Sequence, residues 1–169
     1  MIFTVKQGKH YSDGLIYKAT HLITLTGRLE RTVMFDESCK YSLPKADQRD
    51  VNKLFGYSIG LDHHKNSARF GWHWYQGSIH VSAYVYRDGE RLDLPITELD
   101  LNTRYQFSLE AQTESDFFVI RDHESTIAIA NIERRVKFRG GIQLWPYFGG
   151  NNPAPHDVSI RMESLPLNV

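Results

Sequence analysis

The chain has 169 residues, 41% of them hydrophobic and 24% charged, a composition that suits one globular domain over residues 1–169. It carries 20 Lys and Arg against 20 Asp and Glu, so no net charge draws it to nucleic acid or an anionic membrane, and we expect it to bind neither. The single cysteine, Cys39, excludes an internal disulfide framework and indicates a structural thiol.

The first residues, MIFTVKQGKHYSDG, hold no apolar run long enough for a signal peptide or a membrane span. We therefore expect the mature chain to begin at Met1. A cytoplasmic or virion-associated location fits this beginning best.

Short runs with period two recur about every 8 to 12 residues between clusters of Gly, Asp, Asn and Pro. They predict strands at Ile2–Val5, Leu22–Arg28, Thr32–Phe35, Phe55–Leu61, Ala68–Tyr75, Ser78–Tyr86, Arg91–Pro95, Thr103–Ala111, Phe117–Arg121, Thr126–Ile132, Gly141–Tyr147 and Val158–Glu163. Only Lys45–Leu54 has a pattern that allows one or two helical turns. This rhythm predicts an all-β fold of two packed antiparallel sheets, a β-sandwich or jelly roll.

The stretch SARFGWHWYQGSIHVSAYVYRDGERLDL carries its own pairing register. Gln76–Gly77 and Asp88–Gly89 are two-residue turn signals between alternating runs. Two tight hairpins would place His73 opposite His80, Arg69 opposite Tyr84, and Tyr84 opposite Asp93.

The same register divides these strands into two faces. We predict a polar, ring-rich face with Arg69, Gly71, His73, Tyr75, His80, Ser82, Tyr84, Tyr86, Arg91 and Asp93. The apolar face would carry Phe70, Trp72, Trp74, Ile79, Val81, Ala83, Val85, Leu92 and Leu94. A facing sheet could come from the Phe107/Leu109, Ile127/Ile129 and Val158/Ile160/Met162 alternations.

The ring-rich face is the first candidate site. Exposed Tyr and His beside Arg and Asp suit a sugar, because rings stack on C–H faces while charged groups bond paired hydroxyls. A plainer interpretation is that this face is the solvent-exposed second face of an antiparallel sheet and binds nothing. His73 and His80 could also face a metal, but no third ligand has matching spacing, so we predict neither a metal nor a cofactor.

Two loops could border this face. In Leu61–Ser67, the adjacent His63 and His64 would point apart on extended chain, which favours a structural or rim role over catalysis. In Leu144–Asp157, Trp145 and Tyr147 would share one side and form a lip of the same groove, although Gly and Pro there also set a rigid loop.

Other charged segments carry weaker signals. The basic run Arg134–Arg139 alternates like the solvated face of a strand. The carboxylate pairs Glu98/Asp100 and Glu114/Asp116 fall in expected turns and indicate solvated charge only. No nucleophile elbow, phosphate-binding glycine loop, dinucleotide fingerprint or Cys/His metal quartet occurs, and we assign no catalytic residue.

The strand rhythm resembles that of the concanavalin A-like lectin/glucanase jelly rolls over most of the chain. The blocks HHKNSARFGWHW, SIHVSAYVYRDGER and LWPYFGGNNPAPHDVSI are also similar to small uncharacterised bacterial and phage-borne proteins. The first likeness implies a jelly-roll fold, and the second supports that fold without implying an activity.

Within the jelly rolls, alginate-lyase-type polysaccharide lyases are similar in the order of Arg69, Ile79–His80 and Tyr147–Phe148. The chain departs from them because no Arg-Glu motif surrounds Arg69 and Gly-Gly-Asn-Asn replaces a Lys- and Tyr-containing continuation. This resemblance would carry over only His80 as a base and Tyr147 as an acid.

The leading hypothesis is a non-catalytic β-sandwich that binds a glycan or a protein surface. Such a protein could form a homo-oligomer or be a structural subunit of a phage particle. The site residues would be Arg69, His73, His80, Tyr84, Asp93, Trp145 and Tyr147. Two alternatives remain open, a lyase-like polysaccharide-cleaving enzyme and a pure structural scaffold.

Overall fold

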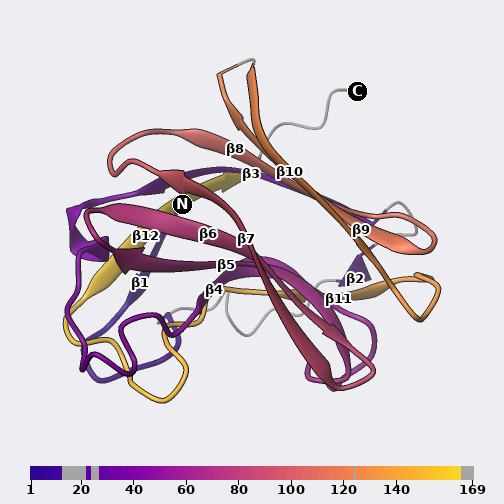
Figure 1. Cartoon of the computed structure of the whole chain (residues 1–169), viewed down its shortest axis with the longest axis horizontal. Helices are drawn as coiled ribbons and strands as arrows, with labels where there is room; N and C mark the ends of the chain where they lie inside the picture. The colour runs from indigo at the N-terminus through magenta and orange to yellow at the C-terminus, as the bar shows by residue number, and fades with distance from the viewer. Residues whose placement is uncertain (13–21, 24–26, 124, 165–169) are drawn as a thin grey trace.

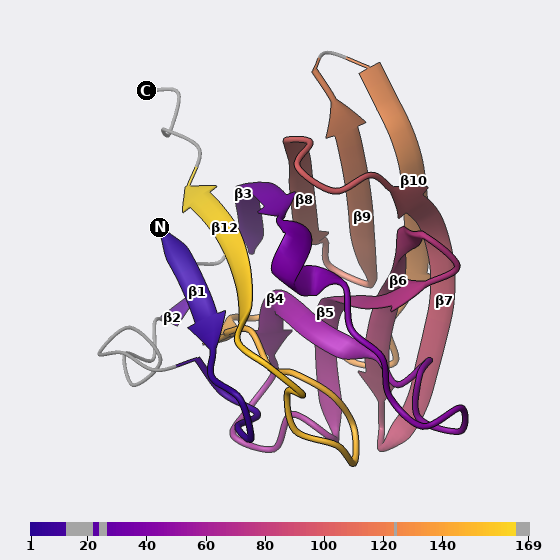
Figure 2. The same ribbon diagram turned by 90° about the vertical axis from the view of Figure 1, so that its left-hand side faces the viewer.

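The computed structural model describes residues 1–12, 22–23, 27–123 and 125–164. Two antiparallel sheets form two layers, one above the other in Figure 1 and seen from the side in Figure 2. The first sheet has the order β1 (Ile2–Val5), β12 (Val158–Ser164), β3 (Arg28–Phe35), β8 (Tyr105–Ala111), β9 (Ser115–Asp122) and β10 (Ser125–Glu133). The second has the order β2 (Leu22–Ile23), β11 (Gly141–Leu144), β4 (Asn52–Ser58), β5 (Asn66–Tyr75), β6 (Ser78–Arg87) and β7 (Glu90–Leu99). The predicted all-β sandwich is confirmed.

The core lies between the layers and is rich in aromatic side chains. Phe70 and Trp72 of β5 meet Phe35 and Phe107 of the first sheet, with ring centroids 4.9 Å apart for Phe70–Phe107 and 5.2 Å apart for Trp72–Phe35. All four rings are at most 1% exposed. Burial of such rings is the main favourable contribution to folding, so this interdigitation fixes how the two sheets stack.

One predicted part of the core is wrong. Phe107, Leu109, Val158, Ile160 and Met162 are buried as expected. On β10, however, Ile127 and Ile129 are exposed by 42% and 58%, and Ala130 and Ile132 are buried instead. The β10–β9 register shifts between Thr126 and Ala128, and this bulge turns the following side chains to the opposite faces.

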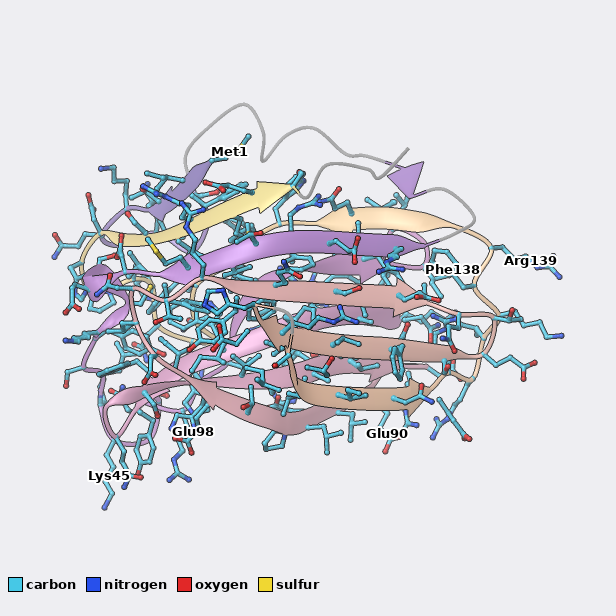
Figure 3. The ribbon with its side chains drawn as sticks, turned by 90° about the horizontal axis from the view of Figure 1, so that it is seen from above. Met1, Lys45, Glu90, Glu98, Phe138 and Arg139 are labelled. Carbon is cyan, nitrogen blue, oxygen red and sulfur yellow. The ribbon has the colours of Figure 1, made fainter. Side chains whose placement is uncertain are left out.

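The edge strand β7 also differs from expectation. It was expected to end at Pro95 but continues to Leu99. An edge strand tolerates proline, which has no backbone N–H to donate. The β6–β7 register also shifts next to Pro95, between Val81 and Ser82 of β6. Leu94 pairs with the buried Ala83 but is 42% exposed, since it lies on the outermost strand of its sheet. Figure 3 shows Glu90 and Glu98 near opposite ends of this strand.

The helical turns expected over Lys45–Leu54 are wrong in their second half. Residues 45–49 form turns, but β4 begins at Asn52 and places Leu54 in the core. The one short 3-10 helix in the described chain is Glu37–Cys39, capped by Asp36. In the described residues, no helix has the length and apolar character needed to cross a lipid bilayer.

The basic run is not a strand. Residues 134–140 form loop structure, and Arg134 is a buried partner of Asp116 on β9, with Nη1 2.5 Å from Oδ1. The Tyr57 hydroxyl donates to the same carboxylate. The solvated-charge interpretation of Asp116 is therefore wrong, because a buried ion pair joins β9 to the loop that follows β10. Cys39 is buried, as a structural thiol should be.

Candidate functional site

The predicted hairpin register is confirmed in every pair. His73 lies opposite His80, Arg69 opposite Tyr84, and Tyr84 opposite Asp93. Gln76 and Gly77 have φ values of 50° and 92°, and Asp88 and Gly89 have 51° and 85°. Positive φ at both central residues defines the tight turn whose twist matches paired strands.

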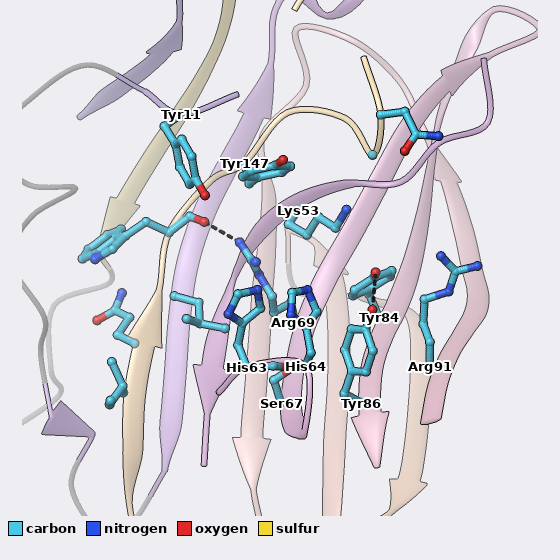
Figure 4. Close-up of a pocket in the computed structure, with 16 residues that line it drawn as sticks. Tyr11, Lys53, His63, His64, Ser67, Arg69, Tyr84, Tyr86, Arg91 and Tyr147 are labelled. Carbon is cyan, nitrogen blue, oxygen red and sulfur yellow. Dashed lines mark hydrogen bonds between the residues drawn. The ribbon is translucent and has the colours of Figure 1, made fainter. Parts of the chain in front are cut away.

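The outer face of the second sheet contains a cavity of about 520 Å³, here called the first cavity (Figure 4). It lies above β4, β5, β6 and β11, with the loop before β5 and the segment after β11 on its sides. Its principal side chains are Tyr11, Lys53, His63, His64, Arg69, Tyr84, Tyr86, Arg91 and Tyr147. The volume lies within the range typical of small-molecule sites, roughly 300–1,000 Å³.

A bulge in β4 positions Lys53. The β4–β5 register shifts between Lys53 and Gly56, so that Leu54 and Phe55 are both fully buried although they are consecutive. Lys53 keeps the outer face, opposite Gly71. A Cβ on Gly71 would lie 2.5 Å from Val51 Cγ1, so glycine permits the close packing beneath this lysine.

The Lys53 ammonium lies between two aromatic rings. Nζ is 4.9 Å from the ring centroid of Tyr84 and 5.3 Å from that of Tyr147, and it donates to the carbonyl of Gly149 over 3.1 Å. Burial, and then the nearby charge of Arg69, lowers the pKa of Lys53 to about 8. Burial thus removes part of the water that would otherwise solvate this ammonium group.

Tyr147 is fixed by backbone pairing on both sides. It exchanges hydrogen bonds with Lys53 and forms a second bridge with Tyr11. Its ring stacks on His10, with centroids 5.1 Å apart, and meets Tyr11 edge-on at 4.9 Å. The segment after β11 thus continues along the edge of β4 and presents at the cavity rim the ring of Tyr147, one of the two rings that the lip hypothesis named.

Arg69 is 6% exposed and donates from Nη2 to the carbonyl of Trp145 over 2.5 Å (Figure 4). The Trp145 ring stacks on Phe3, with centroids 5.7 Å apart, and packs against the core. Trp145 therefore contributes to the cavity by its backbone and holds the guanidinium in place.

The two histidines of the Leu61–Ser67 loop do not point apart. Residues 63–65 form a turn, in which Asp62 Oδ1 accepts from the backbone N–H of His64 over 2.9 Å. The rings of His63 and His64 lie with centroids 4.1 Å apart, beside Arg69 in Figure 4. Burial, and then His64, lowers the pKa of His63. The adjacent Asp was the sequence signal for this turn, because Asp side chains bond the backbone two residues on.

His73, His80 and Asp93 lie in a second hollow on the same face, here called the second cavity, of about 500 Å³. The rings of His73 and His80 stack 5.1 Å apart with their planes 10° from parallel. His80 Nδ1 lies 3.7 Å from Glu98, and Arg49 lies over the ring of Tyr75 at 4.2 Å. Burial, and then His80, lowers the pKa of His73.

The structure therefore divides the residues that the sequence grouped on one face. Arg69, Tyr84, Trp145 and Tyr147 line the first cavity, whereas His73, His80 and Asp93 line the second. The two cavities adjoin at the cross-strand pair Tyr84–Asp93. Among the described residues, no group of three or more His, Cys, Asp and Glu side chains is arranged to hold a metal ion.

Tyr11 and Lys53 line the first cavity but were not predicted from the sequence, and His63 and His64 were predicted only as part of a loop at its rim. The β4 bulge is the reason that the sequence did not indicate Lys53 as a site residue. Gln143 lies on β11 opposite Tyr57, a core residue of β4, so its side chain shares the inner face of the sheet, whereas Ile142 and Leu144 alternate toward the first cavity.

No protein-family model and no curated protein sequence matches this chain. Several solved structures share its fold. A functionally unknown protein from Saccharomyces cerevisiae has a TM-score of 0.59 at 5% identity, over 97% of this chain and 87% of that one. The alginate lyase from Klebsiella pneumoniae has a TM-score of 0.53 at 8% identity, over 86% of this chain and 59% of the lyase.

The enzymatically active domain of tailspike protein 2 from Bacteriophage CBA120 has a TM-score of 0.51 at 11% identity, over 98% of this chain and 27% of that one. The chain thus spans less than two thirds of the lyase and about a quarter of the tailspike domain. At these identities the likeness shows the fold alone, and this protein is a jelly-roll β-sandwich.

Proposed function

We propose that this protein is a glycan-binding β-sandwich whose ligand occupies the first cavity. The observation that carries the proposal is the composition of the cavity wall, which combines tyrosine rings with fixed polar donors. A sugar has C–H faces that stack on rings and paired hydroxyls that need oriented partners. Tyr84 and Tyr147 supply rings on two sides of the cavity. Arg69 supplies a guanidinium whose position is fixed by its hydrogen bond to the carbonyl of Trp145.

The second cavity extends this surface. It adjoins the first at Tyr84–Asp93 and offers stacked imidazoles, the carboxylates of Asp93 and Glu98, and the Tyr75 ring. A saccharide chain of several units could therefore lie across both cavities. The fold supports the proposal only by analogy, since solved structures that share it include one named as an alginate lyase.

A non-catalytic role is favoured by the separation of the acid–base pair implied by the lyase resemblance. His80 lines the second cavity and Tyr147 the first. General acid–base catalysis requires both groups within reach of one substrate atom or its neighbour, directly or through a water.

Polysaccharide cleavage by β-elimination is the second candidate function. His63, whose lowered pKa keeps it neutral near pH 7, shares the first cavity with Tyr147 and Arg69. A neutral imidazole or a tyrosine could remove a proton while the guanidinium offsets charge on a uronate. Appearance of unsaturated product absorbance with uronate polymers would support cleavage, and its loss in His63→Ala would assign the base.

A glycan array tests the binding function directly. The wild type and Tyr147→Ala should be compared with Ile129→Thr, a control on the exposed face of β10. We expect saccharide signals with the wild type and Ile129→Thr that fall sharply in Tyr147→Ala. No signal on any glycan, together with a stable assembly in light scattering, would contradict the proposal and favour the scaffold.

A further inference from the structure

The charged groups of the first cavity are all of one sign. Lys53, Arg69 and Arg91 line it, and none of its described lining residues is an Asp or Glu. The whole protein carries equal numbers of acidic and basic residues, so this local excess does not follow from composition. A concave surface lined by one sign of charge concentrates ions of the opposite sign.

The cations are positioned by the protein and lie partly out of water. Lys53 is held between two tyrosines, and Arg69 is 6% exposed. Desolvated cations are costly unless an anion or several acceptors pair with them. Around Lys53 the ring faces and the carbonyl of Gly149 bring partial negative charge. The carboxylates of Asp50 and Asp93, neither of which lines the cavity, act on Lys53 less than burial does, and its pKa stays lowered.

The second cavity provides an internal contrast. It shares the sheet face and has a similar size, but it contains the carboxylates of Asp93 and Glu98 beside Arg49 and two imidazoles. Both signs of charge therefore meet in the second cavity, whereas the described lining of the first cavity carries positive charge alone.

We infer that the saccharide bound in the first cavity is acidic, with a carboxylate or sulfate group placed between Lys53 and Arg69. This inference rests on the proposed function and names the class of its ligand. The guanidinium and ammonium form charge-assisted hydrogen bonds to the anionic group, and Tyr84 and Tyr147 contact the sugar ring. Arg91, on the exposed edge strand, lies where a second acidic unit would enter.

Calorimetry with paired oligosaccharides tests the inference. Oligogalacturonate and its carboxyl-reduced form differ only in the carboxylate, and a sulfated galactan with its desulfated form provides the same comparison for sulfate. We expect one acidic member to bind at least about tenfold more tightly than its neutral partner, because charged hydrogen bonds contribute more than neutral ones. The pair that shows the difference identifies the anionic group.

Lys53→Met is the decisive variant, with Lys137→Met as its control, since Lys137 is exposed and lies outside the first cavity. Lys53→Met should reduce the preference for the acidic form to about twofold or less, while Lys137→Met leaves it unchanged. Equal binding of acidic and neutral forms by the wild type would overturn the inference but keep glycan binding. No binding of any of the four, together with an empty glycan array, would overturn both.

Discussion

Lys53 and Tyr147 exchange two backbone hydrogen bonds, 2.8 Å and 2.9 Å long, at the edge of the second sheet. This pairing continues the β11–β4 ladder beyond Leu144 and carries the tyrosine ring to within 5.3 Å of the lysine Nζ. The cation and the ring are therefore fixed by main-chain structure, which is more rigid than a contact between two long side chains. Binding in the first cavity depends on this arrangement.

Replacing the ring of Tyr147 tests its contact with the sugar. Tyr147→Ala should weaken saccharide binding by about 1 kcal/mol, roughly fivefold, which is the contribution of one stacked ring. Tyr147→Phe keeps the ring and should stay within about twofold of the wild type by calorimetry. Equal loss in both variants would assign the effect to the hydroxyl and contradict a stacking role.

Binding of an acidic saccharide should depend on alkaline pH through Lys53. Burial lowers the pKa of this lysine to about 8, so its positive charge is lost as the pH rises through that value. Affinity should fall between pH 7 and pH 9, with a midpoint displaced upward by the bound anion. Lys53→Arg should bind almost equally at both pH values, and a wild-type affinity that rises with pH would contradict this assignment.

The buried ion pair between β9 and the loop that follows β10 should control stability. Arg134 and Asp116 have side chains only 5% and 1% exposed. Arg134→Met leaves a buried carboxylate without its cation and should lower the free energy of unfolding by about 3–5 kcal/mol at pH 8 in urea denaturation. A loss below 1 kcal/mol would contradict the role of this pair.

The same variant should be less destabilising in acid. Burial raises the pKa of Asp116 from 3.8 to about 6, although Arg134 opposes the shift. Because the folded-state pKa lies above the unfolded one, the stability contributed by this carboxyl is fully present below about pH 4 and is lost as the pH rises through about 6. The loss in Arg134→Met should therefore be smaller at pH 5 than at pH 8, whereas Arg134→Met combined with Asp116→Asn should show little pH difference.

Gly56 marks the closest approach of β4 to β5. A Cβ there would lie 2.0 Å from the carbonyl oxygen of Ala68 and 2.6 Å from Cα of Arg69. Gly56→Ala must separate the strands and should cost about 2–3 kcal/mol, together with weaker ligand binding because Arg69 moves. Gly60→Ala is the control, because it meets no atom within 4 Å and only its φ of +85° adds strain, about 1 kcal/mol. Equal melting temperatures for the two variants would contradict this account.

The sequence predicted the hairpin region in detail because its register depends on local chemistry. Gln76–Gly77 and Asp88–Gly89 specify two-residue turns, and period-two alternation then fixes every β5–β6 pair and the β6–β7 pairs from the turn as far as Ser82 and Pro95. Once His73 and His80 are opposed, they must also share a face. The polar face, the apolar face and the stacked imidazoles all follow from those two turns.

The bulges could not be predicted in the same way. A bulge adds one residue to one strand, and its position depends on the partner strand rather than on a local motif. The bulge in β4 buries both Leu54 and Phe55, and the one in β10 exposes Ile127 and Ile129. The position of Lys53 on the outer face of β4 therefore does not follow from the sequence pattern.

The division of the face into two cavities depends on segments that are distant in the chain. The turn at His63 and His64 and the strand-like pairing of Tyr147 close the first cavity, and neither follows from the alternation of β5 and β6. The sequence indicated that rings gather on this face. Only the folded arrangement shows which rings surround the cations.

The most direct measurement is an amide chemical-shift titration of the protein with the oligosaccharide that gives the strongest array signal. The account predicts that the largest shifts fall on Lys53, His63, Arg69, Tyr84 and Tyr147, around the first cavity, with smaller shifts near His80 and Asp93 as the saccharide chain lengthens. Shifts confined to the outer face of β10, or none in the first cavity at saturation, would contradict it.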